Sequence, residues 1–186
     1  MLTAGDVRFK INGGLLMEET HDYSKGDWIV HAYYGIGQIK GKEVQCISGE
    51  ESRYYKIQGT DSTYWMPVDQ MDSEALRPLA TTEEMEQAID VLQEPPKEMS
   101  SNQNTRKGRI RRVQRKNKPK SVARLVRDLQ ARQKDKGTLN QNERTAFSVL
   151  KQQLIEEWAI VSGLNFETTA SKMDALLDQQ LLPEGD

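Results

Sequence analysis

The chain has 186 residues, of which 36% are hydrophobic and 29% are charged, and its formal net charge is −2 at pH 7. Apolar runs stay well short of the roughly 20 residues that span a bilayer, and the first residues lack the basic and apolar blocks of a secretory signal. Cys46 is the single cysteine, so disulfides within the chain are impossible and a reducing compartment is expected. This composition is typical of a cytoplasmic protein without a membrane partner.

The near-neutral total conceals a separation of charge along the chain. Residues 69–98 carry 2 basic and 9 acidic side chains, whereas residues 106–136 carry 14 basic and 2 acidic ones. The second segment is therefore strongly cationic in a protein that is acidic elsewhere. Positive charge gathered in this way indicates a polyanionic partner.

The first half of the chain shows the two-residue alternation of β-structure. In an N-terminal extension over residues 1–23, apolar residues alternate ahead of Asn12-Gly13, which predicts a β-hairpin. From Gly26 to Pro67, short apolar runs rich in β-branched and aromatic residues are separated by glycine-containing turns. Four or five strands joined so closely predict a small, strongly bent sheet or barrel. Gly35-Ile36-Gly37 is expected to be a hairpin turn, because no helix follows it as a dinucleotide-binding loop would require.

Two side chains of this region need interpretation. Cys46 lies in a predicted strand and is expected to be a small buried hydrophobe rather than a nucleophile. Trp65 ends a strand just before Pro67. It is either an exposed anchor on a sheet edge, where a partner strand could add, or a core tryptophan of a small barrel. The sequence leaves both interpretations open.

A short helix is predicted to close the first domain, which covers residues 24–95. It begins at Thr82-Glu83-Glu84-Met85, where acidic side chains favour a helix N-terminus, and it stops at Pro95-Pro96. Residues 96–108 hold a polar Ser-Ser-Asn-Gln-Asn-Thr run with almost no apolar content. We therefore expect these residues to be the linker between two independently folding domains.

Residues 109–182 are expected to form the second domain. Gly137 is a candidate C-terminal cap of one helix, Asn140 and Glu143 suit a reciprocal N-terminal cap of the next, and Asn165 suits the N-terminus of a last one. The first of these helices has apolar residues at helical spacing, namely Val122, Leu125, Val126 and Leu129. Three helices with short connections predict an all-α bundle, and the chain as a whole an α+β two-domain fold.

Catalysis finds little support in the sequence. The two histidines, His21 and His31, have no cysteine or acidic cluster around them at metal-ligand spacing. We expect a protein that is not an enzyme, with no metal, no cofactor and no small-molecule substrate.

The basic run over residues 106–120 is the strongest functional signal. It holds nine cations and no acidic residue, and arginine among them can grip phosphate with two parallel hydrogen bonds. Charges at this density repel one another unless a polyanion neutralises them. The run lacks the aromatic residues of a stacking platform, so phosphate contact is expected. The alternative is a solvated linker that only keeps the protein in solution.

Motifs in both halves of the chain occur in an order that resembles one known family. They are Lys25-Gly26-Asp27-Trp28-Ile29-Val30, Tyr34-Gly35-Ile36-Gly37-Gln38-Ile39, Tyr54-Tyr55-Lys56-Ile57, Met66-Pro67-Val68, Leu125-Val126-Arg127-Asp128-Leu129, Asp135-Lys136-Gly137-Thr138-Leu139 and Asn140 with Glu143. On these residues, about 24–180, the chain resembles the CarD/CdnL-type regulators that bind RNA polymerase. The first domain of that family is shared with the transcription-repair coupling factor.

The resemblance implies a Tudor-like first domain that docks on the β subunit of RNA polymerase by strand addition. It implies a helical domain that contacts promoter DNA at the upstream edge of the melted region, and a nucleoid-associated location. The candidate polymerase-binding residues are Gln45, Arg53, Trp65, Met66 and Pro67. The candidate DNA-binding residues are Arg109, Ile110, Arg111, Arg112, Arg115, Lys116 and Lys118. Ile110 precedes Arg111-Arg112 where the family commonly has a tryptophan wedge, and an apolar side chain can fill that role.

The leading hypothesis is a polymerase-bound transcription regulator that contacts promoter DNA and steadies the open complex. One alternative is an adaptor that binds polymerase, or a nucleic-acid translocase, without a specific DNA role. A second alternative, independent of the family, is an RNA-binding protein that uses the basic run.

Overall fold

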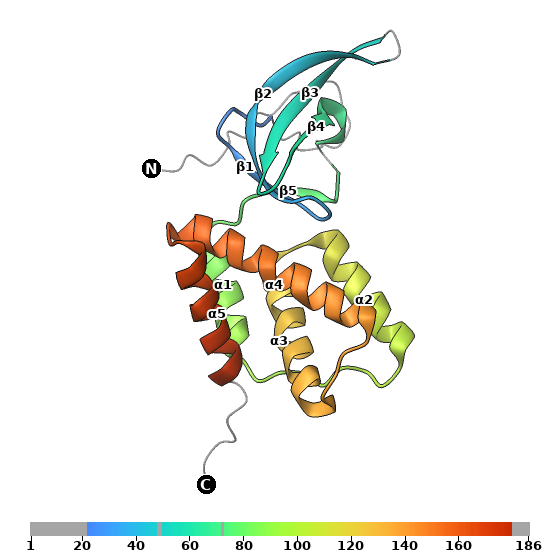
Figure 1. The fold of residues 1–186 in the computed structure, drawn as a ribbon, viewed down its shortest axis with the longest axis vertical. Coiled ribbons are helices and arrows are strands. Elements are labelled where there is room, and N and C mark those ends of the chain that lie inside the picture. Colours follow the sequence, from blue (N-terminus) through green and yellow to red (C-terminus); the bar gives the residue numbers. More distant parts are fainter. Residues whose placement is uncertain (1–21, 48–49, 72, 180–186) are drawn as a thin grey trace, which may run out of the picture. The chain divides into compact units, whose positions relative to one another are not determined.

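The structure of the chain is a computed structural model that describes residues 22–47, 50–71 and 73–179. The chain divides after Pro78 into two compact units, Met1–Pro78 and Leu79–Asp186. Strands build the first unit and helices build the second (Figure 1). The α+β two-domain fold predicted from the sequence is therefore confirmed. The hairpin expected near Asn12-Gly13 lies outside the described residues.

The first unit is an antiparallel sheet with strand order β4-β3-β2-β1-β5. Its elements are β1 (Trp28–His31), β2 (Gly35–Ile47), β3 (Glu50–Gly59), β4 (Thr63–Pro67), the 3₁₀ turn η1 (Val68–Gln70) and β5 (Leu76–Pro78). β2 and β3 form a long hairpin whose strands bend (Figure 1), with a register shift between Ile39 and Gly41. A β-bulge of this kind bends a strand and increases its twist. The Tudor-like character of the domain stays a prediction.

Two glycines shape the connection from β1 to β2. Gly35 has a φ of +72°, a left-handed conformation that side chains with a Cβ disfavour. Gly37 lies against β3 so closely that a Cβ there would stand 2.5 Å from Cγ2 of Ile57. The hairpin predicted around Gly35-Ile36-Gly37 is confirmed, with β1 and β2 paired from His31 opposite Gly35 onwards.

The apolar core of the first unit lies on one side of the sheet. It is formed by Tyr23, Ile29, Ile39, Tyr55, Ile57, Met66, Met71 and Leu76. Cys46 does not belong to it, since its side chain is exposed, and the prediction of a buried cysteine is wrong. The reason is that Cys46 pairs with Glu51 near the far end of the β2–β3 hairpin, beyond the core residues of both strands.

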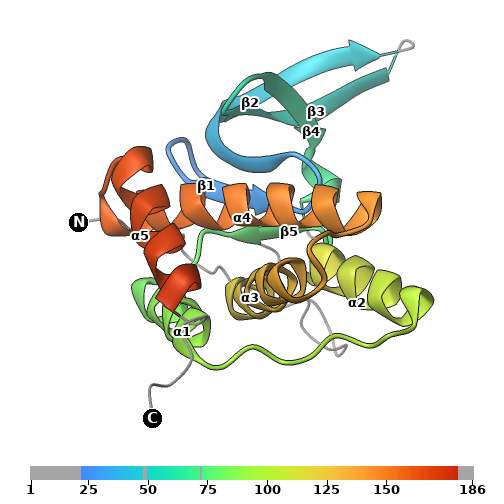
Figure 2. The same ribbon diagram turned by 60° about the horizontal axis from the view of Figure 1, so that its bottom comes forward.

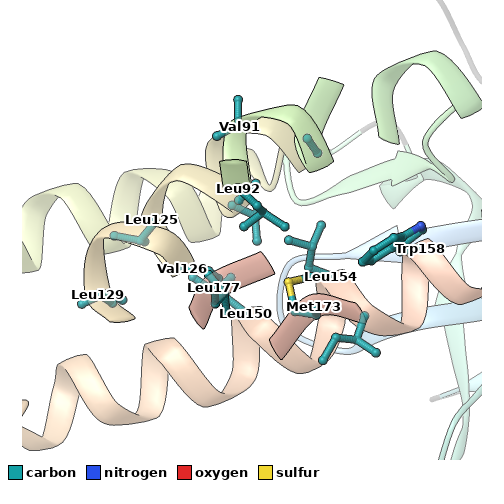
Figure 3. Packing of buried hydrophobic residues seen from close by; sticks show 14 of the residues in the cluster. Val91, Leu92, Leu125, Val126, Leu129, Leu150, Leu154, Trp158, Met173 and Leu177 are labelled. Carbon is teal, nitrogen blue, oxygen red and sulfur yellow. The ribbon is translucent and has the colours of Figure 1, made fainter. Parts of the chain in front are cut away.

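The second unit is a bundle with one core. Its helices are α1 (Thr82–Gln93), α2 (Gln103–Lys116), α3 (Pro119–Lys136), α4 (Gln141–Ser162) and α5 (Phe166–Gln179). In Figures 1 and 2, α3 lies between α1 and α2. Figure 3 shows side chains from four of these helices meeting in the core, namely Val91 and Leu92 of α1, Leu125, Val126 and Leu129 of α3, Leu150, Leu154 and Trp158 of α4, and Met173 and Leu177 of α5.

The helix ends confirm the capping signals in the sequence. Asn140 and Glu143 form a reciprocal capping box at the start of α4. Gly137 ends α3 with a φ of +72°, and Oδ1 of Asn165 accepts the backbone N–H of Thr168 at 2.8 Å. Among the described residues, no helix is both long and apolar enough to cross a membrane.

The domain boundary differs from the predicted one. α1 was expected to close the strand domain, but Met85, Ala88, Val91 and Leu92 are buried in the core of the helical unit. The expected linker, residues 96–108, contains the start of α2 with Asn102 as its N-cap. Polar composition was misleading here, because buried or paired arginine side chains help to hold α2 to the bundle together with Ile110 and Val113.

Candidate sheet-edge docking site and nucleic-acid interface

Trp65 lies on the exposed face of an edge strand. Within the described residues, β4 pairs with β3 on one side only. The Trp65 side chain is 42% exposed and stands opposite Lys56 of β3, outside the apolar core. Of the two interpretations left open by the sequence, the core tryptophan is wrong. An edge strand presents backbone N–H and C=O groups to which another chain can add.

Polar contacts hold the Trp65 ring in place. Its Nε1–H donates to Oε2 of Glu43 at 2.8 Å. Nζ of Lys56 lies 3.1 Å from Oε1 of Glu43 and 5.6 Å from the centroid of the indole ring. The hydrogen bond from Trp65, followed by the one from Lys56, holds the pKa of Glu43 below its ordinary value. Glu43 is therefore charged at neutral pH, and the aromatic surface is ordered before any partner binds.

The other candidate polymerase-binding residues lie on two faces of the sheet. Paired residues share a face and successive residues alternate, so the register places Gln45 and Pro67 on the same face as Trp65. Arg53 is exposed on the opposite face. Met66 is buried on the core face, opposite to the face that carries Trp65. The predicted residues thus lie on two faces. The prediction missed Glu43 and Lys56, which contact Trp65 and belong to no sequence motif.

The basic run forms a helix with two different faces. Residues three or four apart on a helix lie on the same side, and α2 carries most of the run. Arg106 and Ile110 are buried against the bundle. Lys107, Arg111 and Arg115 follow one another at four-residue spacing and are all exposed. Some cations of the run therefore pack against the bundle, whereas others are exposed to solvent.

Arg106 attaches the first turn of α2 to α4. Its Nε lies 2.5 Å from Oε1 of Glu143, and its Nη1 donates to two backbone carbonyls just before the helix. Arg132 of α3 approaches the other oxygen of Glu143 at 3.6 Å. Burial by itself raises the pKa of Glu143. Hydrogen bonds from Arg106 and from the backbone of Asn140, together with the charges of Arg106 and Arg132, lower this pKa by more than burial raises it. The net pKa lies below its ordinary value, so this buried carboxylate is ionised and paired.

Arg109 attaches the second turn of α2 to α3. Its Nη2 lies 2.5 Å from Oδ2 of Asp128, whose side chain is fully buried. The other oxygen of Asp128 accepts from Arg127 at 3.0 Å and from the backbone N–H of Lys97 at 3.0 Å. Removing one partner of a buried ion pair leaves a charge without compensation, which costs several kcal/mol. Arg109, a candidate DNA-binding residue, is therefore engaged in the fold.

Ile110 is not available as a wedge. Its side chain is 1% exposed and belongs to the core of the helical unit. Insertion between base pairs would require α2 to leave the bundle, together with the ion pairs of Arg106 and Arg109. The wedge role expected from the tryptophan of the family does not hold here, because Ile110, one turn after Arg106 on the same side of α2, turns into the core.

The remaining cations gather on the outside of α2 and the start of α3. We call them the cationic face, which consists of Lys107, Arg111, Arg112, Arg115, Lys116, Lys118, Lys120 and Arg124, all exposed. Among the described residues, the ion pairs of the helical unit involve the inward cations Arg106 and Arg109 and none of Arg111, Arg112 or Lys116. Lys107, Lys120 and Arg124 were missing from the predicted set, although their four-residue spacing from other cations was visible in the sequence.

The start of α3 adds to the positive potential. Lys118 is its N-cap, Pro119 its first residue, and its first turn has no acidic side chain. Because a helix dipole places partial positive charge at this end, cations here are unfavourable until an anion is bound. Backbone N–H groups at a helix N-terminus are also suited to phosphate. The arrangement of the cationic face thus favours a polyanionic ligand.

Comparison with known families matches both units in order. Residues 23–80 match the CarD-like/TRCF RID domain, and residues 87–174 match the C-terminal domain of CarD. The chain belongs to the CarD-like family. The division after Pro78 lies two residues before the end of the first match, and the second match begins within α1, which belongs to the helical unit.

Individual relatives support the first match. The transcription-repair-coupling factors of Staphylococcus epidermidis and Staphylococcus aureus are each 42% identical to the chain over 53 residues. That segment is 27% of this chain and 4% of each relative, so the chain corresponds to a very small part of those proteins.

The first unit of this CarD-like protein is thus of a domain type that CarD-like proteins share with TRCF, and the second is of the type that forms the C-terminal domain of CarD. Within the described part of the chain, no group of three or more histidine, cysteine or acidic side chains is placed to hold a metal ion.

Proposed function

We propose that this CarD-like protein binds the β subunit of RNA polymerase by strand addition at β4 and binds promoter DNA through the cationic face. The observation that carries the DNA half is the sorting of charge on α2. Inward-facing Arg106 and Arg109 are matched by buried acids of α4 and α3. Outward-facing Arg111, Arg112 and Lys116, in contrast, take part in none of the ion pairs of the described residues. A linker that only needed to stay in solution would have no reason for this division.

Binding at two sites gives a physical route to regulation. A protein held on polymerase meets the neighbouring DNA at a high effective concentration, so even weak phosphate contacts become occupied. If those contacts form best with DNA in its open-complex path, they stabilise the open complex by their differential binding energy. The protein would then act on the nucleoid, wherever polymerase initiates.

Arg111→Ala tests the DNA interface. Each phosphate contact contributes about −0.9 to the slope of log affinity against log salt, so the variant should bind all DNA sequences more weakly and lower that slope by about one unit. Fluorescence anisotropy of the full chain with duplex DNA over a salt series measures both quantities. Lys172→Ala, which removes an exposed cation of α5, is the matched control and should leave the slope unchanged.

The outcomes also separate the alternatives. A slope that is the same in Arg111→Ala, Lys172→Ala and the unmodified chain would remove the DNA role and leave a polymerase-binding adaptor. Clear preference for single-stranded RNA over promoter duplex in the same titration would favour an RNA-binding protein.

Trp65→Ala tests the polymerase interface. Aromatic hot spots at the centre of an interface contribute about 2 kcal/mol or more, so affinity for core polymerase should fall by that amount while the domain stays folded. Tyr33→Ala, at an exposed aromatic on the β1–β2 turn, is the matched control. Equal losses in both variants, or none in Trp65→Ala, would contradict docking at β4.

A further inference from the structure

An open pocket with several polar residues in its lining lies beside β4 in the first unit. It encloses about 390 Å³ and is lined by His31 of β1, Met66 of β4, Asp69 and Gln70 of η1, and Ser73. β1 and β4 are separated by two other strands in the sheet, so the pocket exists because the sheet curls. Met66 connects it to β4, the strand proposed to receive the polymerase segment.

His31 brings a hydrogen-bond donor to this pocket. Its Nδ1 accepts the backbone N–H groups of Tyr33 at 3.1 Å and of Tyr34 at 3.2 Å. A nitrogen that accepts two N–H groups has no proton of its own, so in the neutral ring the proton is on Nε2. The side chain is 7% exposed, and burial lowers its pKa, which keeps the ring neutral. Within the described residues, Nε2–H has no acceptor.

Asp69 provides a hydrogen-bond acceptor in the same pocket. It is exposed, and its carboxylate makes no ion pair or hydrogen bond with the described part of the chain. An ionised carboxylate is only an acceptor, so Asp69 can accept a hydrogen bond from a ligand while Nε2–H of His31 can donate one. Gln70 and Ser73 can serve as either.

The register of strand addition shows how a ligand group would reach the pocket. Residues directly opposite each other on paired strands share a face of the sheet. Met66 points to the core face of β4 and lines the pocket. A residue of an added strand that stands opposite Met66 would therefore project on the pocket side, whereas its neighbours would project toward Trp65.

We propose that the pocket receives a carboxamide side chain, glutamine or asparagine, from the RNA polymerase segment that adds to β4. The amide oxygen accepts from Nε2–H of His31, and the amide NH₂ donates to Asp69. An arginine or lysine side chain could donate to Asp69, but it has no acceptor for Nε2–H of His31. A carboxylate side chain could accept from His31, but the negative charge of Asp69 would repel it. An apolar side chain would leave both groups without partners. This inference rests on the proposed docking at β4 and adds the chemistry of the residue that is recognised.

Two substitutions at one position test the proposal. Hydrogen bonds to a charged group contribute enough that Asp69→Ala should weaken binding of the full chain to core polymerase by about 10-fold or more. Asp69→Asn keeps an acceptor oxygen for an amide donor, so it should stay within about 3-fold of the unmodified chain. Asp61→Ala removes an exposed acid from the β3–β4 turn, outside the pocket, and serves as the charge control. Thermal unfolding confirms that each variant is folded.

The binding data distinguish a carboxamide in the pocket from a cation and from an unused pocket. If Asp69→Asn is as weak as Asp69→Ala, and high salt abolishes the difference from the unmodified chain, the occupant is a cation and the proposal is overturned. If Asp69→Ala binds normally while Trp65→Ala is weak, the pocket is not used, although docking at β4 stands. If neither Asp69→Ala nor Trp65→Ala weakens binding, the proposed docking at β4 is wrong, and the pocket proposal is wrong with it.

Discussion

Ile110→Ala separates the core position of Ile110 from its expected role as a wedge. The substitution removes Cγ1, Cγ2 and Cδ1 from a side chain that is 1% exposed. Transfer of these carbons to water accounts for about 2 kcal/mol, at roughly 0.8 kcal/mol per methylene. The cavity left behind adds to this loss, and the better helix propensity of alanine offsets a few tenths of a kcal/mol. We expect the free energy of unfolding of the helical unit to fall by about 3 kcal/mol.

The assay is urea unfolding followed by far-UV circular dichroism, which reports on the helical unit. Arg111→Ala, one position further along α2 on the exposed side, is the control and should change stability by less than about 0.5 kcal/mol. DNA affinity measured under native conditions should show the reverse order, with Arg111→Ala weakened more. The core assignment of Ile110 would be refuted by an Ile110→Ala variant of normal stability that loses its preference for easily unstacked pyrimidine–purine steps.

Three further predictions concern the forces that hold the two units. Glu143 has a lowered pKa in the folded state, so its ionised form adds stability above its ordinary pKa of 4.5 that is lost as the pH falls through the lower folded value; Glu143→Gln should be less stable at pH 7, and the gap should narrow in acid-unfolding curves below that pH. Gly37→Ala places a Cβ 2.5 Å from Cγ2 of Ile57, and a calorimetric melt should show the strand unit destabilised by about 1–3 kcal/mol. The same substitution at Gly108, where a Cβ meets nothing within 4 Å, should stabilise the helical unit by about 0.5–1 kcal/mol in urea unfolding; destabilisation there would show that the glycine has a packing role.

The sequence predicted correctly those features that depend on a single helix, strand or turn. The capping box of Asn140 and Glu143 and the terminal Gly137 depend on hydrogen bonds and backbone angles within one turn. Alternation of side chains in the strands and the turn at Gly35 are equally local. The separation of charge also needs no structure, since it is a property of composition along the chain.

The packing of α1 and α2 could not be predicted from such local signals. The apolar stripe of α1 predicts a helix, but nothing local says that its partners are α3, α4 and α5 rather than the sheet. In α2 the inward residues include Arg106 and Arg109, and composition cannot distinguish these arginines from the outward ones. Arg106 meets Glu143 from 37 residues away, and Arg109 meets Asp128 from 19 residues away.

The sequence by itself therefore determined that this protein has a strand half, a helical half and a cationic segment between acidic ones. Only the tertiary structure decided which cations pack and which face solvent, that Ile110 is buried, and that Trp65 is exposed on an edge strand. The physical reason is that burial and ion pairing depend on partners brought together by the fold. Caps, turns and alternation, in contrast, are satisfied by neighbours in the chain.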